Sequence, residues 1–263
     1  MPNTYVHPAA VIPLAHLGLP LSALAVGSVA PDFNAYFAPS SRFGHTMAGV
    51  FLSCLPLGLA VLLAFHYLLK HPMLSLLPRS QQQRLLPVAN QFHLSSFKDI
   101  LWVFVALLIG VVTHLVWDSF THPDGWSVNQ MAMLLRSNRI QTPWGPFQLH
   151  EVLQVASKYL GIGIILFAYV KWFRRAPSTT QNVSFSLSTV EKLGVTVPMV
   201  AIALLIGVWK NLDTVRAVTD FDSFRLSCRA MLKTSSLILA VEVMIYSLWW
   251  QIAAHKAKKV ESF

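Results

Sequence analysis

The sequence predicts an all-α, polytopic membrane protein: a helical bundle of about five transmembrane helices preceded by an irregular apolar N-terminal region. Hydrophobic residues make up 54% of the chain and charged residues 12%, which is below half the charged share of soluble domains. The mean hydropathy is +0.54. No strand-like alternation indicates a membrane barrel, and hydrocarbon does not tolerate unpaired backbone groups, so helices are expected.

Five apolar stretches are long enough to be membrane spans, for which about 20 helical residues are needed. They comprise residues 46–69, 100–120, 152–172, 193–209 and 235–252. The fourth is short and contains Pro198, which predicts a kink or a tilt. The polar segment 71–98, with three prolines, is typical of a solvated connector. Segment 123–151 is too long for a simple link and could form a lid.

The region before the first span is apolar but broken by prolines and glycines. No Lys or Arg precedes Arg42, so a cleaved signal peptide, which begins with basic residues, is not expected. Short helices or a re-entrant element shielded by protein fit this pattern. We therefore predict one integral membrane domain, 1–263, that consists of this N-terminal region (1–45), the helical bundle (46–254) and a basic tail (255–263).

The basic residues indicate orientation and partners. With an outward N-terminus, the inner sections contain eleven Lys and Arg residues and the outer sections eight, and the cytoplasmic side normally holds the excess. The net charge of +9 therefore predicts contact with anionic membrane lipids. No basic block is interleaved with stacking aromatic residues, so nucleic acid is not an expected partner. The oligomeric state stays open.

Three polar residues follow one another at four-residue spacing near the end of the second span: His114, Asp118 and His122. In a helix this spacing turns each side chain about 40° past the one before it, so all three lie on one face. Imidazoles and a carboxylate suit zinc or a similar divalent ion. A helix cap or a hydrogen-bonded network is the alternative interpretation of such a triplet.

Further candidate ligands lie at the same end of the spans. His45 begins the first span, His150 and Glu151 begin the third, and His7 and Asp32 bracket the N-terminal region. This alignment depends only on the alternation of the spans, and an outward N-terminus places it at the outer face. Because titratable clusters inside membrane proteins are functional-site candidates, the sequence predicts a metal site there.

Four motifs carry a resemblance to a known family: His7-Pro8-Ala9, residues 27–32, Gly44-His45-Thr46 and residues 113–122. Through them most of the chain resembles the bacterial membrane-protein family catalogued as domain of unknown function 4184, which has no established activity. This resemblance implies a multi-pass protein of the bacterial inner (cytoplasmic) membrane.

A looser resemblance links the same motif order to membrane-bound metal-dependent hydrolases and to the zinc-dependent phospholipase C and single-strand nuclease group. It implies six metal ligands: His7, Asp32, His45, His114, Asp118 and His122. The chain departs from the soluble zinc enzymes, in which the last His usually stands further from the Asp. The free amino terminus that can bind metal in those enzymes has no clear counterpart here.

These observations favour a membrane-embedded, metal-dependent hydrolase that cleaves a phosphoester or an ester of a lipid-like substrate at the interface. A divalent metal, for which zinc is the best match, would activate water and polarise the substrate. Asp118 or Asp32 would serve as the catalytic base or bridge two ions, and His150 or Glu151 would orient the ligands. The alternative is a non-enzymatic integral membrane protein, a transporter or assembly factor, with a His/Asp cluster that binds an ion or fixes helix packing.

Overall fold

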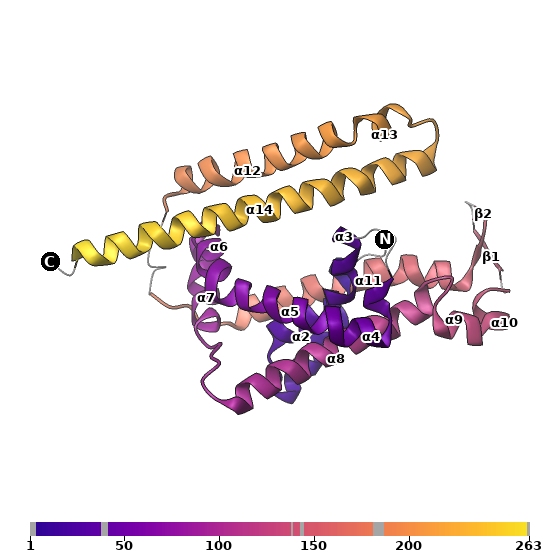
Figure 1. The fold of residues 1–263 in the computed structure, drawn as a ribbon, viewed down its shortest axis with the longest axis horizontal. Helices are drawn as coiled ribbons and strands as arrows, with labels where there is room; N and C mark the ends of the chain where they lie inside the picture. The colour runs from indigo at the N-terminus through magenta and orange to yellow at the C-terminus, as the bar shows by residue number, and fades with distance from the viewer. Residues whose placement is uncertain (1–3, 38–41, 138, 143–144, 181–186, 262–263) are drawn as a thin grey trace. The chain divides into compact units, whose positions relative to one another are not determined.

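The computed structural model describes residues 4–37, 42–137, 139–142, 145–180 and 187–261. These residues are almost entirely helical, and five helices are long and apolar enough to cross a membrane (Figure 1). The predicted fold class is thereby confirmed. The chain forms two compact units, one from Met1–Leu63 with His93–Ala176 and one from Ala64–Phe92 with Pro177–Phe263, and each is described by itself. The prediction of one domain stays a prediction.

The N-terminal part of the first unit is a series of short helices. In chain order they are η1 (Thr4–Val6), α1 (Pro8–Val11), η2 (Ile12–Leu17), α2 (Leu21–Val29), η3 (Ala30–Phe33), α3 (Asn34–Phe37) and η4 (Phe43–His45). Proline explains the interruptions, because it is tolerated in the first turn of a helix but not in its interior. Pro8, Pro13 and Pro31 each stand at such a first turn. Gly18 ends η2 in a left-handed conformation with φ 75°.

The first span, Met47–Leu76, contains two wide π-helical turns and is shared by both units. The first unit contains α4 (Met47–Gly49), η5 (Val50–Cys54) and α5 (Leu55–Leu63). The second unit contains η6 (Ala64–Leu69) and α6 (Lys70–Leu76). The Thr46 side chain caps α4 by accepting the Gly49 amide at 3.0 Å, which fixes where the span begins.

The rest of the first unit contains two long helices and a small hairpin. Its elements are α8 (Phe97–Thr121), α9 (Trp126–Gln130), α10 (Ala132–Leu135), β1 (Arg139–Thr142), β2 (Gly145–Gln148) and α11 (Leu149–Arg175). The strands are antiparallel, with Arg139 opposite Gln148. This hairpin lies in the segment predicted as a lid and was not expected from the sequence. Pro143 and Trp144, which belong to that segment, lie outside the described residues.

The core of the first unit is the contact of α2 with α8. The helices approach so closely that a Cβ atom on Gly27 would lie 2.2 Å from the Leu107 carbonyl oxygen. A Cβ atom on Gly110 would lie 2.4 Å from the Leu24 carbonyl oxygen. Small residues allow this approach, which replaces side-chain contacts with backbone packing between apolar helices.

The second unit is built around a pair of long helices. Its remaining elements are α7 (Arg79–Ala89), α12 (Thr189–Lys210), α13 (Leu212–Arg216) and α14 (Phe221–Glu261). Gly207 packs against Ser235, and Asn211 Nδ2 donates to Thr234 Oγ1 at 3.1 Å, so α12 and α14 run antiparallel (Figure 1). Tyr246 and Trp250 of α14 form a buried cluster with residues of α6 and α7.

The observed spans are longer than the predicted ones. They run Met47–Leu76, Phe97–Gln130, Leu149–Arg175, Thr189–Lys210 and Ser223–Lys256. The segment expected to be a connector contains most of α6 and all of α7. Pro78 precedes α7, where proline is tolerated, and the helix continues through Pro87. The residues expected as a tail continue α14 as far as Glu261. Whether the N-terminal region enters the membrane stays a prediction.

Replacing Gly110 by Ala should destabilise the first unit by about 1–3 kcal/mol, because the new methyl group would collide with the α2 backbone. Thermal unfolding of the purified protein in detergent measures this loss. Gly163→Ala is the matched control, since nothing lies within 4 Å of a Cβ atom at Gly163 in α11. Equal stability of the two variants would contradict the close α2–α8 contact.

Candidate metal centre

His114 is held in place by the backbone of α2. Its ring is fully buried, and Nδ1 lies 2.8 Å from the carbonyl oxygen of Ser28. A carbonyl oxygen only accepts hydrogen bonds, so Nδ1 carries the hydrogen and donates it. When the ring is neutral, its Nε2 atom therefore keeps its lone pair. A backbone carbonyl on one ring nitrogen is the usual way in which a protein orients a metal-binding histidine.

The Nε2 atom of His114 faces His45 and Asp118. It lies 3.3 Å from His45 Nε2 and 3.3 Å from Asp118 Oδ2, and His45 Nε2 lies 3.4 Å from the same Asp118 oxygen. These three atoms form a nearly equilateral triangle. A tetrahedral zinc ion with bonds of about 2.0–2.1 Å has ligand-to-ligand edges of about 3.3–3.4 Å. The triangle therefore has the size of one face of such a site.

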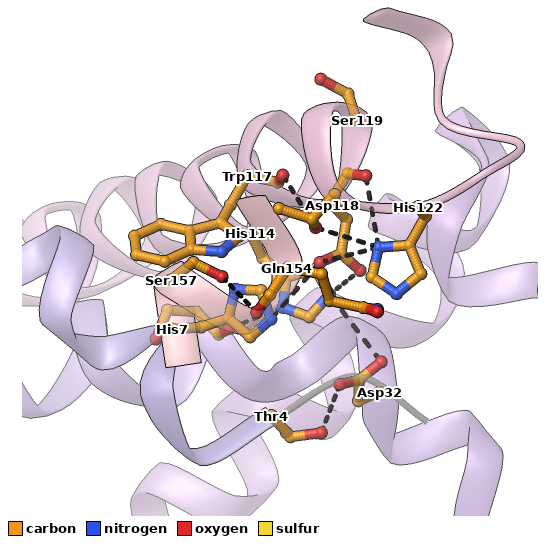
Figure 2. A network of polar contacts seen from close by, with 12 residues as sticks. Thr4, His7, Asp32, His114, Trp117, Asp118, Ser119, His122, Gln154 and Ser157 are labelled. Atoms are coloured by element: carbon orange, nitrogen blue, oxygen red, sulfur yellow. Dashed lines mark hydrogen bonds and ion pairs between the residues drawn. The ribbon is translucent and has the colours of Figure 1, made fainter. Parts of the chain in front are cut away.

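Asp32 completes a group of four. Its Oδ1 atom lies 3.8 Å from Nε2 of both His45 and His114, and the ligand atoms of all four residues lie within 4.8 Å of one another. The hydroxyl of Thr4 donates to the other oxygen of Asp32 (Figure 2). The side chain of Asp32 is buried, which leaves it little contact with water. The four residues could hold a divalent metal ion.

His45 reaches this group through a tight approach between η4 and η3. A Cβ atom on Gly44 would lie 2.3 Å from the Pro31 carbonyl oxygen, so only glycine fits beside η3 at this position. The neighbouring residues His45 and Asp32 are thereby brought together. The side chain of His45 is 32% exposed, whereas His114 and the two aspartates are buried, so water reaches the group from the His45 side.

The second oxygen of Asp118 faces a different pair of histidines. Oδ1 lies 3.4 Å from His7 Nε2 and 3.5 Å from His122 Nδ1 (Figure 2). His122 Nδ1 also lies 3.3 Å from the backbone carbonyl oxygen of Asp118, to which it donates in the absence of an ion. The Oδ1 atom is buried and has no hydrogen-bond partner among the described residues. Leaving a buried carboxylate oxygen without a partner is costly. The ring of His7 stacks on that of His114 at 4.0 Å, which holds it beside Asp118.

Burial keeps His7 neutral. The pKa of His7 is lowered from 6.5 to about 3, chiefly because burial disfavours the charged ring and also because His114 lies against it. Asp118 acts in the opposite direction but does not compensate. A neutral imidazole is the form that binds a metal ion.

The structure brings six of the eight predicted residues together: His7, Asp32, His45, His114, Asp118 and His122. Their role as ligands stays a prediction. The Glu151 carboxylate accepts the Gln148 amide at 2.8 Å and so caps α11. His150 is buried at the same helix end and is not part of the group of four.

Two supporting groups were not predicted from the sequence. No side-chain pattern in the sequence indicates the Ser28 carbonyl as a partner of His114, although Ser28 lies in the motif of residues 27–32. The Thr4 hydroxyl is separated from Asp32 by 28 residues, and an isolated threonine predicts nothing about its partner.

One known protein family matches nearly the whole chain. A family model described as domain of unknown function (DUF4184) matches residues 1–257, so the chain belongs to that family. Neither the curated proteins nor the solved structures yield a match.

In the ion-free protein, His7 should stay neutral well below the pH at which an ordinary histidine is half protonated. Nitrogen-15 NMR of histidine-labelled protein measures this, with His7→Gln to assign the signal. The unfolded chain takes up a proton at His7 below about pH 6.5 and the folded chain only near pH 3, so folding loses stability as the pH falls between these values. A His7 signal that titrates near 6.5 would contradict the burial.

Proposed function

We propose that this member of the DUF4184 family is a membrane-embedded, metal-dependent hydrolase that cleaves a phosphoester or ester bond of a lipid-like substrate at the membrane interface. The observation that supports it most is the triangle of His45, His114 and Asp118 with edges of 3.3–3.4 Å. Two imidazole nitrogens and a carboxylate oxygen at this spacing match a catalytic zinc site, which has three protein ligands and one open position.

The bound ion would lower the pKa of a coordinated water and polarise the bond to be cleaved. His45, His114 and Asp118 would hold it. Asp32 lies slightly further out, with its Oδ1 atom 3.8 Å from both nitrogens, and the Thr4 hydroxyl occupies its other oxygen. Asp32 is therefore positioned to accept the proton of the attacking water as a general base.

A second ion would sit on the other side of Asp118. The Oδ1 atom, which is buried without a hydrogen-bond partner among the described residues, faces His7 and His122. His122 would bind this ion through Nδ1 as the tautomer with its hydrogen on Nε2, which gives up the contact of Nδ1 with the Asp118 carbonyl. Asp118 would then bridge two ions, as carboxylates do in two-metal hydrolytic sites. A cation at this position would satisfy an oxygen that is otherwise costly to bury.

The surroundings of the open side favour a lipid-like substrate. His45 stands two residues before the span that begins at Met47, and His122 directly follows α8, so the group lies near the start of one span and the end of α8. Phe43 and Met47, which flank His45 in the chain, are 41% and 74% exposed. These apolar side chains could accompany the acyl chains of a substrate whose headgroup reaches the ion. The distribution of Lys and Arg supports an outer location.

Metal analysis of the purified protein tests both ion positions. We expect about two divalent ions per chain in the wild type and about one in His122→Ala, which lacks a ligand of the second position only. Asp118→Asn should retain almost none, because Asp118 contributes to both positions. His93→Ala is the control, since this histidine is exposed and lies in the same unit. A wild type without stoichiometric metal would refute the proposal.

Hydrolysis of phosphodiester, phospholipid and ester reporter substrates tests catalysis. Asp32→Asn should lower turnover by about 100-fold or more while retaining metal, because it removes the proton acceptor but not the triangle. Asp213→Asn replaces an exposed aspartate of the other unit and should have no effect. A metal-loaded wild type that hydrolyses none of these substrates would favour a transporter or assembly factor with a structural ion.

A further inference from the structure

The second unit contains a cavity of about 570 Å³ where α6 ends and where α7 and α12 begin. Its position is fixed by two membrane spans, since Leu76 ends the first and Thr189 begins the fourth. The cavity therefore lies at the depth of a membrane boundary, where lipid headgroups are found. It is separate from the His/Asp group, which belongs to the first unit.

The charged residues that line this cavity are both cations, Arg79 and Lys192, and none of the described residues that line it is acidic. Arg79 is exposed and has no hydrogen bond or ion pair with the described residues. The nearest acidic residue in the chain, Glu191, is engaged elsewhere, because its carboxylate accepts the Ser188 amide at 2.8 Å. The positive charge of the cavity is thus not compensated by the described residues that line it.

The walls around these cations are fixed by hydrogen bonds. The Lys192 ammonium donates to the Leu77 carbonyl at 2.8 Å, and Gln82 Nε2 donates to the same oxygen at 2.9 Å. Gln82 Nε2 also donates to the Ser75 carbonyl at 3.1 Å. An ammonium group has three donors, so the contact with Leu77 leaves two of them for a ligand.

Backbone dipoles add to the positive potential. Helix α7 begins at the cavity, and the amino-terminal end of a helix carries a partial positive charge. Helix α12 also begins there, but Ser188 and Glu191 cap it. Pro78, which precedes α7, provides no side-chain cap, and no acidic residue occupies the first turn. Arg79 therefore stands where a cation is electrostatically unfavourable. An anion in the cavity would relieve this repulsion.

The cavity also has an apolar side. Leu76, Leu187 and Leu193 line it together with the cations, and Leu193 is 56% exposed. A soluble anion would make no favourable contact with these apolar walls. A phospholipid would place its phosphate at the cations and its acyl chains at the leucines. We propose that this cavity binds the phosphate headgroup of an anionic phospholipid, with Arg79 and Lys192 as the charged contacts and the leucines beside the acyl chains.

Native mass spectrometry of the full chain in detergent tests the proposal. Phosphatidylglycerol and phosphatidylcholine with identical acyl chains are titrated separately, and the ratio of their apparent affinities is measured. Two membrane-facing cations predict a preference for phosphatidylglycerol of about thirty-fold. Arg79→Gln should reduce this preference by about five-fold, and Arg79→Gln with Lys192→Gln should abolish it.

Lys256→Gln is the matched control, because Lys256 is an exposed cation near the end of α14 and does not line the cavity. It should retain the full preference. If Lys192→Gln impairs folding, Arg79→Gln alone still decides, since Arg79 makes no described polar contact. An unchanged preference in Arg79→Gln, or an equal loss in Lys256→Gln, would overturn the proposal. Protection of the wild type against heat by inorganic phosphate as strong as that by phosphatidylglycerol would overturn the assignment to a lipid.

Discussion

The close packing of α2 on α8 is the constraint on which the His/Asp group depends. Two glycines, Gly27 and Gly110, let the backbones approach, and this approach brings the Ser28 carbonyl to His114. The hydrogen bond then decides which ring nitrogen of His114 is free to bind an ion. Because η3 follows α2 directly, the same packing carries Asp32 to the group. A change of a few tenths of an ångström between these helices would therefore alter chemistry as well as stability.

A bound cation would compensate the buried carboxylates of the group. Asp32 and Asp118 are buried carboxylates, and the pKa of neighbouring His7 is lowered so far that its ring does not supply a positive charge near neutral pH. Burial of unpaired charge is costly in a medium of low dielectric constant. A neutral imidazole such as that of His7 can share a metal ion with the carboxylates but adds no positive charge of its own. The proposed ions would therefore account for the burial of the two carboxylates.

Hydropathy predicted the five spans because membrane insertion depends on the average polarity of about 20 residues and hardly on their partners. Helical spacing likewise placed His114, Asp118 and His122 on one face. The Ser28 carbonyl was beyond prediction, since every residue has one and only the packing selects it. Glu151 was expected to orient ligands, which stays a prediction, and its carboxylate accepts the Gln148 amide. Prolines in residues 71–98 predicted a connector, but Pro78 precedes α7 and Pro87 lies within it without ending the helix.

The separation of α2 from α8 along the chain has a consequence for biosynthesis. The ribosome delivers α2 first, and the whole first span follows before α8 emerges. Until then the apolar residues of α2 have no contact with α8, so lipid or the insertion machinery must shield them from water. His114 and Asp118 belong to α8, so the group could bind a metal ion only after α8 has emerged. The order in which the segments leave the translocon therefore sets the earliest point at which the group can form.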